Sequence, residues 1–196
     1  MRYLWLSALV TLCAIRLPPA DAAPQNQSSF KTNATFSVGS KALTLSSAVA
    51  ILEAPRSPGG YSSLRIHFYA FALTPEDIAG ARTGNVESMD RKSNLNSVDP
   101  RVLNSSFAII RLSLGQPDFK VLRVDMTIPG NSCTIAPFEQ DVQSFLQTYR
   151  YDGKNLRLKS KGAHVCDFKM LGLPNQTFTW DFDLTLPVFK KATQKM

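Results

Sequence analysis

The segment from Gln176 to Phe189, QTFTWDFDLTLPVF, alternates large apolar and polar side chains with few exceptions. The apolar set is Phe178, Trp180, Phe182, Leu184 and Leu186, and the polar set is Thr177, Thr179, Asp181, Asp183 and Thr185. Successive side chains of a strand point to opposite faces of a sheet, so this period places one set in a core and the other in water. The segment therefore predicts an antiparallel strand with one buried face, limited or placed at a sheet edge by Pro187.

Three further segments alternate less strictly, which indicates that strands make up most of the fold. Residues 42–52 are rich in small and β-branched side chains, while 107–114 and 119–128 carry apolar side chains at every second position. The turn-forming sequence GQPD at 115–118 predicts that the last two segments form a hairpin. A second hairpin is predicted around Asp152-Gly153, because this dipeptide favours a tight reversal.

One clear helix signal follows a predicted strand over residues 63–73. The sequence TPED at 74–77 offers a threonine N-cap, a proline at the first helical position and two acids in the first turn. A second helix is predicted within 135–146. The polar stretch 83–104 predicts a long exposed loop or insertion.

These elements predict a mainly β domain of seven to nine strands with one or two short helices, arranged as an antiparallel two-sheet β-sandwich. A closed lipocalin-like β-barrel is the alternative, although the chain lacks an early Gly-x-Trp and retains only Trp180 after its first 22 residues. We expect a single domain over 23–189, followed by a basic tail at 190–196. No internal repeat supports a solenoid or propeller.

The first 22 residues have the composition of a secretory signal peptide. Arg2 precedes an apolar stretch of 13 residues, Tyr3–Ile15, which is shorter than the roughly 20 residues that span a bilayer. The small-x-small triplet at 20–22 predicts cleavage after Ala22, and an uncleaved membrane anchor is the alternative. We therefore expect a secreted or periplasmic protein with no integral membrane span after cleavage.

The chain has 22 Lys and Arg against 15 Asp and Glu, a formal net charge of +7, and cleavage of the signal peptide would leave +6. The basic residues are scattered, with a mild concentration in residues 150–162. Such a surface can favour anionic partners such as acidic lipid or polysaccharide. No nucleic-acid-binding motif is present, so no nucleic-acid partner is expected.

The chain after residue 22 holds two cysteines, Cys133 and Cys166, and two histidines, His67 and His164. In an oxidising compartment an even pair of cysteines predicts a disulfide, which would contribute about 3 to 4 kcal/mol through loop closure. The four side chains could instead form a Cys2His2 zinc site, but no Cys-x2-Cys or His-x3-His spacing supports one. We expect the disulfide, no metal site and no cofactor.

His67 is a weak catalytic candidate. It lies between Arg65 and Tyr69 on the more polar face of its predicted strand, where we expect an exposed or half-exposed histidine without a catalytic role. As a general base it would need an orienting carboxylate, for which Asp90 or Asp99 of the predicted loop are the candidates.

Other catalytic patterns are weaker still. Asp181 and Asp183 alternate on the wet face of one strand, which is typical of a solvated surface and not of the paired carboxylates of a glycosidase. No Gly-x-Ser-x-Gly, Walker A or dinucleotide-binding glycine pattern is present. An enzyme is therefore the less favoured interpretation.

Four Asn-x-Ser/Thr triplets offer glycosylation sites if the protein is eukaryotic. They begin at Asn26, Asn33, Asn104 and Asn175. About one or two such triplets are expected by chance in this composition, and in a bacterial protein they would carry no meaning.

Four segments together resemble a loose class of small exported bacterial proteins of unknown function. They are KALTLSSAVAILE, SLRIHFYAFALTPEDIAG, YRYDGKNLRLKSKG and TFTWDFDLTLPVF, which cover about half of the chain after residue 22. The resemblance implies a secreted or periplasmic β-sandwich and supplies no catalytic residues. The chain departs from the pattern in the loop 83–104 and in the serine-lysine stretch before Lys161-Gly162.

The missing catalytic constellation and the many half-exposed strands favour an exported, non-enzymatic binding or interaction module for an unknown ligand or protein partner. Two alternatives remain open. One is a hydrolase-type enzyme that uses His67 with a loop carboxylate. The other is a carrier that holds lipid or another apolar ligand inside the fold.

Overall fold

A computed structural model describes residues 30–55, 57, 59–82, 107–128, 131–137, 139–167 and 174–191 of the chain. The predicted signal peptide at 1–22, the predicted loop at 83–104 and most of the basic tail lie outside these residues. The same is true of the loop carboxylates Asp90 and Asp99 and of the possible glycosylation sites Asn26 and Asn104.

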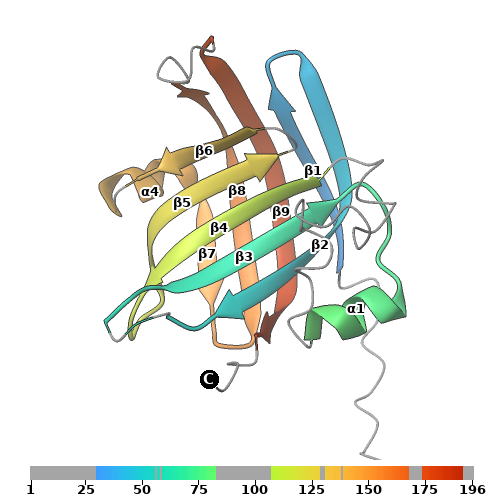
Figure 1. The fold of residues 1–196 in the computed structure, drawn as a ribbon, viewed down its shortest axis with the longest axis vertical. Helices are drawn as coiled ribbons and strands as arrows, with labels where there is room; N and C mark the ends of the chain where they lie inside the picture. Colours follow the sequence, from blue (N-terminus) through green and yellow to red (C-terminus); the bar gives the residue numbers. More distant parts are fainter. Residues whose placement is uncertain are drawn as a thin grey trace, which may run out of the picture.

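The described residues form nine strands and two short helices (Figure 1). The strands are β1 (Lys31–Val38), β2 (Lys41–Glu53), β3 (Ser62–Tyr69), β4 (Phe107–Gly115), β5 (Lys120–Ile128), β6 (Asn131–Ala136), β7 (Thr148–Tyr151), β8 (Asn155–Cys166) and β9 (Gln176–Lys190). The helices are α1 (Pro75–Arg82) and α4 (Glu139–Phe145).

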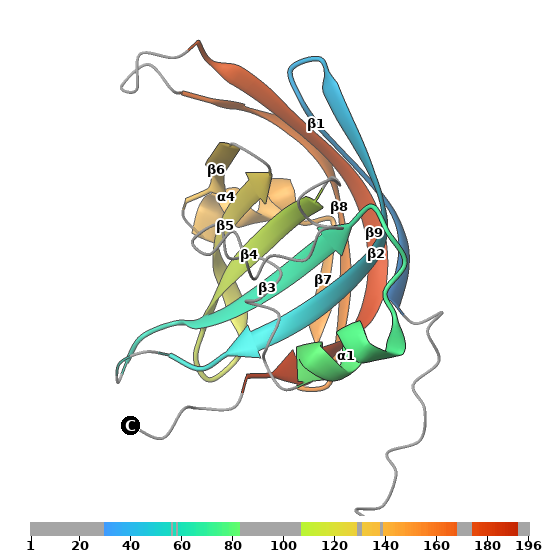
Figure 2. The same ribbon diagram turned by 45° about the vertical axis from the view of Figure 1, so that its right-hand side comes forward.

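All nine strands belong to one sheet, with the order β6-β5-β4-β3-β2-β1-β9-β8-β7. Neighbouring strands in this order are antiparallel, and the end of β2 also pairs in parallel with β9, where Ala50 lies opposite Val188. The sheet curls into a half-barrel (Figure 2). The predicted two-sheet sandwich is therefore wrong, whereas the lipocalin-like alternative is compatible with a curled single sheet.

The curvature has physical causes within the strands. Irregular register occurs in the pairings β1–β2, β4–β5 and β5–β6, and bulges of this kind increase the local twist and bend of a sheet. Four alanines on the concave face are fully buried, and such small side chains leave room for the opposite wall. They are Ala34, Ala48, Ala50 and Ala108. The sheet thus buries its apolar face against itself and does not need a second sheet.

The alternation of the last strand predicted its two faces correctly. The five apolar side chains from Phe178 to Leu186 are at most 5% exposed in β9, and the five polar ones between them are exposed. Both predicted hairpins are present, as β4–β5 and as β7–β8, where Gly153 adopts the positive φ of 88° that the turn requires.

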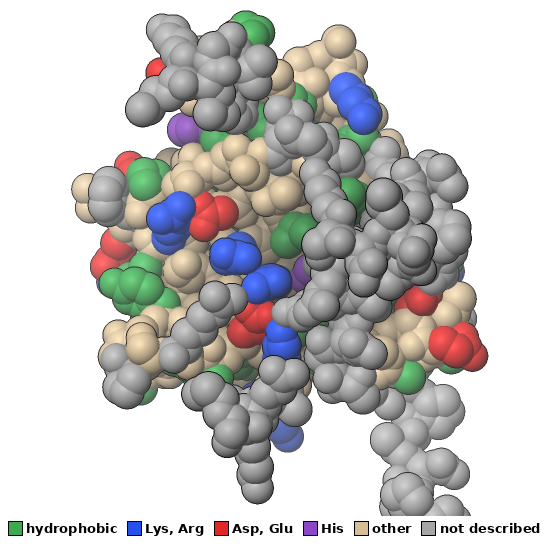
Figure 3. Space-filling model, in the orientation of Figure 1, with side chains coloured by type: hydrophobic (Ala, Val, Ile, Leu, Met, Phe, Trp, Pro, Cys, Tyr) green, Lys and Arg blue, Asp and Glu red, His purple; other side chains and the backbone are tan. Residues whose placement is uncertain are grey.

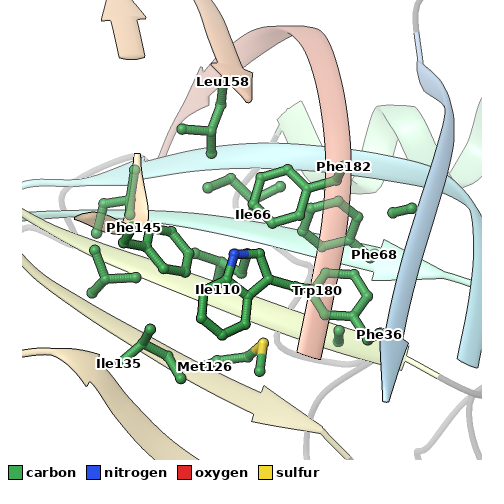
Figure 4. Packing of buried hydrophobic residues seen from close by; sticks show 14 of the residues in the cluster. Phe36, Ile66, Phe68, Ile110, Met126, Ile135, Phe145, Leu158, Trp180 and Phe182 are labelled. Atoms are coloured by element: carbon green, nitrogen blue, oxygen red, sulfur yellow. The ribbon is translucent and has the colours of Figure 1, made fainter. Parts of the chain in front are cut away.

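The concave face holds the main core, in which aromatic rings from several strands meet (Figure 4). Phe36 of β1, Phe68 of β3 and Phe182 of β9 lie with ring centroids 5.1 to 5.8 Å apart. Contacts at these distances add to the free energy gained by burying apolar area. They join the two halves of the curled sheet through its interior.

Helix α1 packs on the convex face of the sheet. Thr74 caps it as predicted. The Thr74 hydroxyl accepts a hydrogen bond of 3.2 Å from the backbone amide of Asp77, and the Asp77 carboxylate accepts one of 2.7 Å from the backbone amide of Thr74. Ile78 and Ala81 then join a second, smaller apolar cluster with side chains of β2 and β3. The convex face is consequently only partly solvated.

Gly162 of β8 makes room for the indole of Trp180, which lies opposite it in β9. A Cβ atom at position 162 would come within 2.7 Å of the Cζ2 atom of Trp180. The indole is 5% exposed and fills the interior at this point, so the glycine is required by packing and not by a backbone turn.

We expect Gly162→Ala to lower the free energy of unfolding by about 1 to 3 kcal/mol, because the indole must move within a close-packed core. Gly80→Ala in α1 is the matched control, since a Cβ there meets nothing within 4 Å. It should be neutral or stabilising by up to about 1 kcal/mol. Urea unfolding followed by tryptophan fluorescence measures both, and equal midpoints for the two variants would contradict the packing role of Gly162.

Candidate functional site

The half-barrel has a seam where the edge strand β6 approaches β8, next to the other edge of the sheet, without pairing with it. β6 and β7 follow one another in the chain but lie at opposite ends of the strand order. The connection from residue 137 to 147, which contains α4, therefore crosses from one edge of the sheet to the other (Figure 2). We use the term seam for this region, bounded by β6, α4, β7 and β8.

A disulfide closes the seam at β6 and β8. Cys133 and Cys166, which the sequence predicts as a pair, are joined with their Cα atoms 6.0 Å apart. Cys133 lies on an edge strand and Cys166 on the second strand from the other edge. Since the bond closes a loop over 33 positions of sequence, it restricts the unfolded chain as well as the seam.

Helix α4 covers the concave face at the middle of the seam. Its buried residues are Val142 and Phe145, each 2% exposed, whereas most of its other side chains are exposed. The ring of Phe145 lies 5.0 Å from that of Trp180 and 6.4 Å from that of Phe182 (Figure 4). The cover is thus held in the core by two apolar side chains.

Ser160 fastens the end of α4 to the sheet. Its hydroxyl donates to the backbone carbonyl of Phe145 and accepts a hydrogen bond of 2.7 Å from Nε1 of Trp180. The amide of Gln147 also donates to the carbonyl of Lys159 at 3.0 Å. Ser160 is fully buried, so both of its partners would lose a hydrogen bond if it were replaced by alanine.

Two tyrosines hold the edge strand β7 against Phe119 in the turn between β4 and β5. The hydroxyl of Tyr149 donates to the carbonyl of Phe119 at 3.0 Å, and the ring of Tyr151 packs edge-on against Phe119 at 5.2 Å. Burial and the nearby Tyr151 raise the pKa of Tyr149 above its usual range, so its hydroxyl stays a donor at neutral pH.

His164 lies beside the disulfide on the concave side of β8. It is half-buried, and one of its ring nitrogens lies within 4.8 Å of the sulfur atoms of Cys133 and Cys166. The four-residue zinc site considered from the sequence is not assembled, because His67 is on the convex side of β3. The structure brings only Cys133, His164 and Cys166 together.

His67 is buried, so the expectation of an exposed or half-exposed strand histidine is wrong. It is 2% exposed and lies in register with Val49 of β2 and Ile109 of β4. Its ring stacks with that of Tyr69 on the same face of β3 at a centroid distance of 6.5 Å. With the proposed partners Asp90 and Asp99 outside the described residues, a catalytic role for His67 stays a prediction.

The carboxylates of β9 lie in an ion-pair ladder with β8. The Asp181 carboxylate accepts a hydrogen bond of 2.6 Å from Nζ of Lys161, and the Asp183 carboxylate forms an ion pair of 3.0 Å with the guanidinium of Arg157. The Asp181 carboxylate raises the pKa of Lys161 above its ordinary value through a hydrogen bond and its charge. Because all four side chains are on the exposed face, the basic concentration at 150–162 is partly neutralised there.

Two open hollows lie on the surface, one of them beside β6. One of about 730 Å³ lies between the β2–β3 loop and the β4–β5 turn, beside the exposed side chain of Tyr61. The other, of about 420 Å³, includes Arg65, Arg111 and Arg123 on the convex face, where charged side chains of both signs gather (Figure 3). In it Arg123 is paired with Asp125 and Thr134, while Arg65 forms an ion pair with Glu53.

Among the possible glycosylation sites, Asn33 and Asn175 are exposed. Within the part of the chain that the structure describes, no helix has the length and apolar character needed to cross a bilayer. Comparisons of the chain with protein-family models, curated proteins and solved structures find no match.

The sequence did not predict the role of Ser160 or of α4. The signal for Ser160 was its position, since it shares the inward face of β8 with Leu156 and Leu158. A serine in an apolar row predicts a buried hydrogen bond, but its partners lie on other elements and could not be named from the sequence.

Replacing Ser160 by alanine should lower the free energy of unfolding by about 1 to 3 kcal/mol, because the indole N–H of Trp180 is left buried without its acceptor. Ser144→Ala in α4 is the matched control, since that exposed hydroxyl only donates to the nearby carbonyl of Asp141. Thermal and urea unfolding measure the difference. A loss no larger for Ser160→Ala than for Ser144→Ala would show that Ser160 does not fasten the helix.

Proposed function

We propose that the protein binds an apolar or single-chain amphipathic ligand on the concave face of its half-barrel, with α4 as a displaceable cover. This is the carrier hypothesis raised by the sequence. Its main support is that a large apolar face is closed at the seam by a seven-residue helix with two buried side chains, Val142 and Phe145. Curled sheets of this kind can hold a ligand between their walls.

The magnitudes favour a long apolar chain as the ligand. Lifting α4 would expose two apolar side chains at about 1.5 to 3 kcal/mol each and break the hydrogen bond of Ser160 to the helix at about 1 kcal/mol. The total is about 4 to 7 kcal/mol. Each buried methylene of a ligand returns about 0.8 kcal/mol, so roughly five to nine methylenes only balance the opening. Acyl chains of about ten carbons or more would therefore bind, and short ones would not.

The proposal fits the predicted exported location, because apolar molecules need a carrier in aqueous compartments. An excess of basic residues would also favour a ligand with an acidic headgroup. Export itself remains a prediction from residues 1–22.

Two measurements test the proposal. Organic extraction of the protein as purified, followed by mass spectrometry, should release a species with a long acyl chain. Titration of solvent-extracted protein with straight-chain fatty acids of increasing length should change the fluorescence of Trp180, with affinity rising with chain length. Absence of an extracted species together with no response to any chain length would contradict the proposal.

Phe145→Ala should bind a long-chain fatty acid at least about tenfold more tightly than the native protein, because opening the cover then costs about 1.5 to 3 kcal/mol less. Phe189→Ala is the matched control. It removes a ring of the same size from the convex-face cluster, where Phe189 stacks on Phe30 at 6.0 Å. Equal affinities for the two variants, or weaker binding by Phe145→Ala, would argue against α4 as the cover.

A further inference from the structure

The side chains of Cys133, His164 and Cys166 bring three possible metal-ligating atoms together at the seam. These atoms all lie within 4.8 Å of one another. His164 and Cys166 are two positions apart in β8 and so share its concave face, while Cys133 reaches them across the seam from β6. The disulfide accounts for the two sulfur atoms but not for the imidazole beside them.

We propose that, when the disulfide is reduced, Cys133, His164 and Cys166 bind one zinc ion or a similar thiophilic ion at the seam. Two thiolates and one imidazole are ligands that zinc prefers, and water can complete a tetrahedral set. Hard ions such as Mg²⁺ and Ca²⁺ prefer oxygen ligands and should not compete. The three side chains are buried or half-buried, which limits access of bulk water to the ion.

The oxidised and metal-bound states exclude each other. A phosphine or dithiol reductant supplies two electrons that break the S–S bond, and two protons from water complete the thiols. Zinc binding then releases these two protons, because the thiolate is the form that ligates metal. In either state β6 is joined to β8, by a covalent bond in one and by coordination in the other. The proposal is independent of ligand binding on the concave face.

Metal titration of the reduced protein under anaerobic conditions tests the site. Cobalt added to the chain lacking residues 1–22 should produce thiolate-to-cobalt charge-transfer bands and the visible bands of a tetrahedral site, saturating at one ion per chain. Zinc should then displace the cobalt and abolish the colour. The oxidised protein should show neither band, because its sulfur atoms are bonded to each other.

The variant His164→Ala separates a three-ligand site from a simple pair of thiols. The loss of His164 as a zinc ligand should weaken zinc binding by at least about tenfold. Even the loss of a residue that only hydrogen-bonds to a metal ligand typically lowers metal affinity 10- to 100-fold. His67→Gln is the matched control, because it alters the other histidine of the chain on the opposite face of the sheet. Its zinc affinity should equal that of the native protein.

A stability measurement keeps the test decisive if reduction loosens the fold. Zinc should raise the urea midpoint of the reduced native protein and of reduced His67→Gln, and should do so less for reduced His164→Ala. Equal zinc affinity and equal stabilisation in His164→Ala would overturn the proposal, as would zinc binding by the oxidised protein at the same strength.

Discussion

The fold depends on holding together two sheet edges that share no backbone hydrogen bonds. β6 and β7 end the sheet on opposite sides, and the seam between them is closed by the Cys133–Cys166 disulfide, by α4 and by the contact of β7 with Phe119. A curled sheet with an open seam would expose apolar side chains such as Phe182 and Met126, which are now at most 1% exposed. Each closure is small, but together they keep the concave face out of water.

The sequence predicted the faces of the strands better than their arrangement. The alternation of β9 and the Asp152-Gly153 turn depend on neighbouring residues, so both were found. The number of sheets could not be predicted, because the alternation of apolar and polar side chains is the same whether the apolar face packs on a second sheet or the sheet curls on itself. The residues beside His67 in the sheet, Val49 and Ile109, come from strands paired with β3, and that pairing is absent from the local pattern.

The candidate site was predictable to a similar degree. The even number of cysteines after residue 22 and the expected oxidising compartment predicted the disulfide. The spacing of His164 and Cys166 predicted that they share one face of a strand. That the disulfide spans a seam required the strand order, and the contact of Phe145 with Trp180 required the path of α4 across it. Helix α4 and the disulfide complete the fold, and their opening would expose the concave face. The stability of the fold and the proposed ligand binding therefore depend on the same parts of the structure.

Hydrogen–deuterium exchange with and without a reductant tests the closure of the seam most directly. If the disulfide and α4 close the half-barrel, reduction should raise exchange in β6, in residues 137–147 and in β7, where few hydrogen bonds hold the backbone. β2, β3 and β9 lie inside the sheet and should keep their protection. An equal rise across all strands, or no change in β6 and α4, would contradict the account.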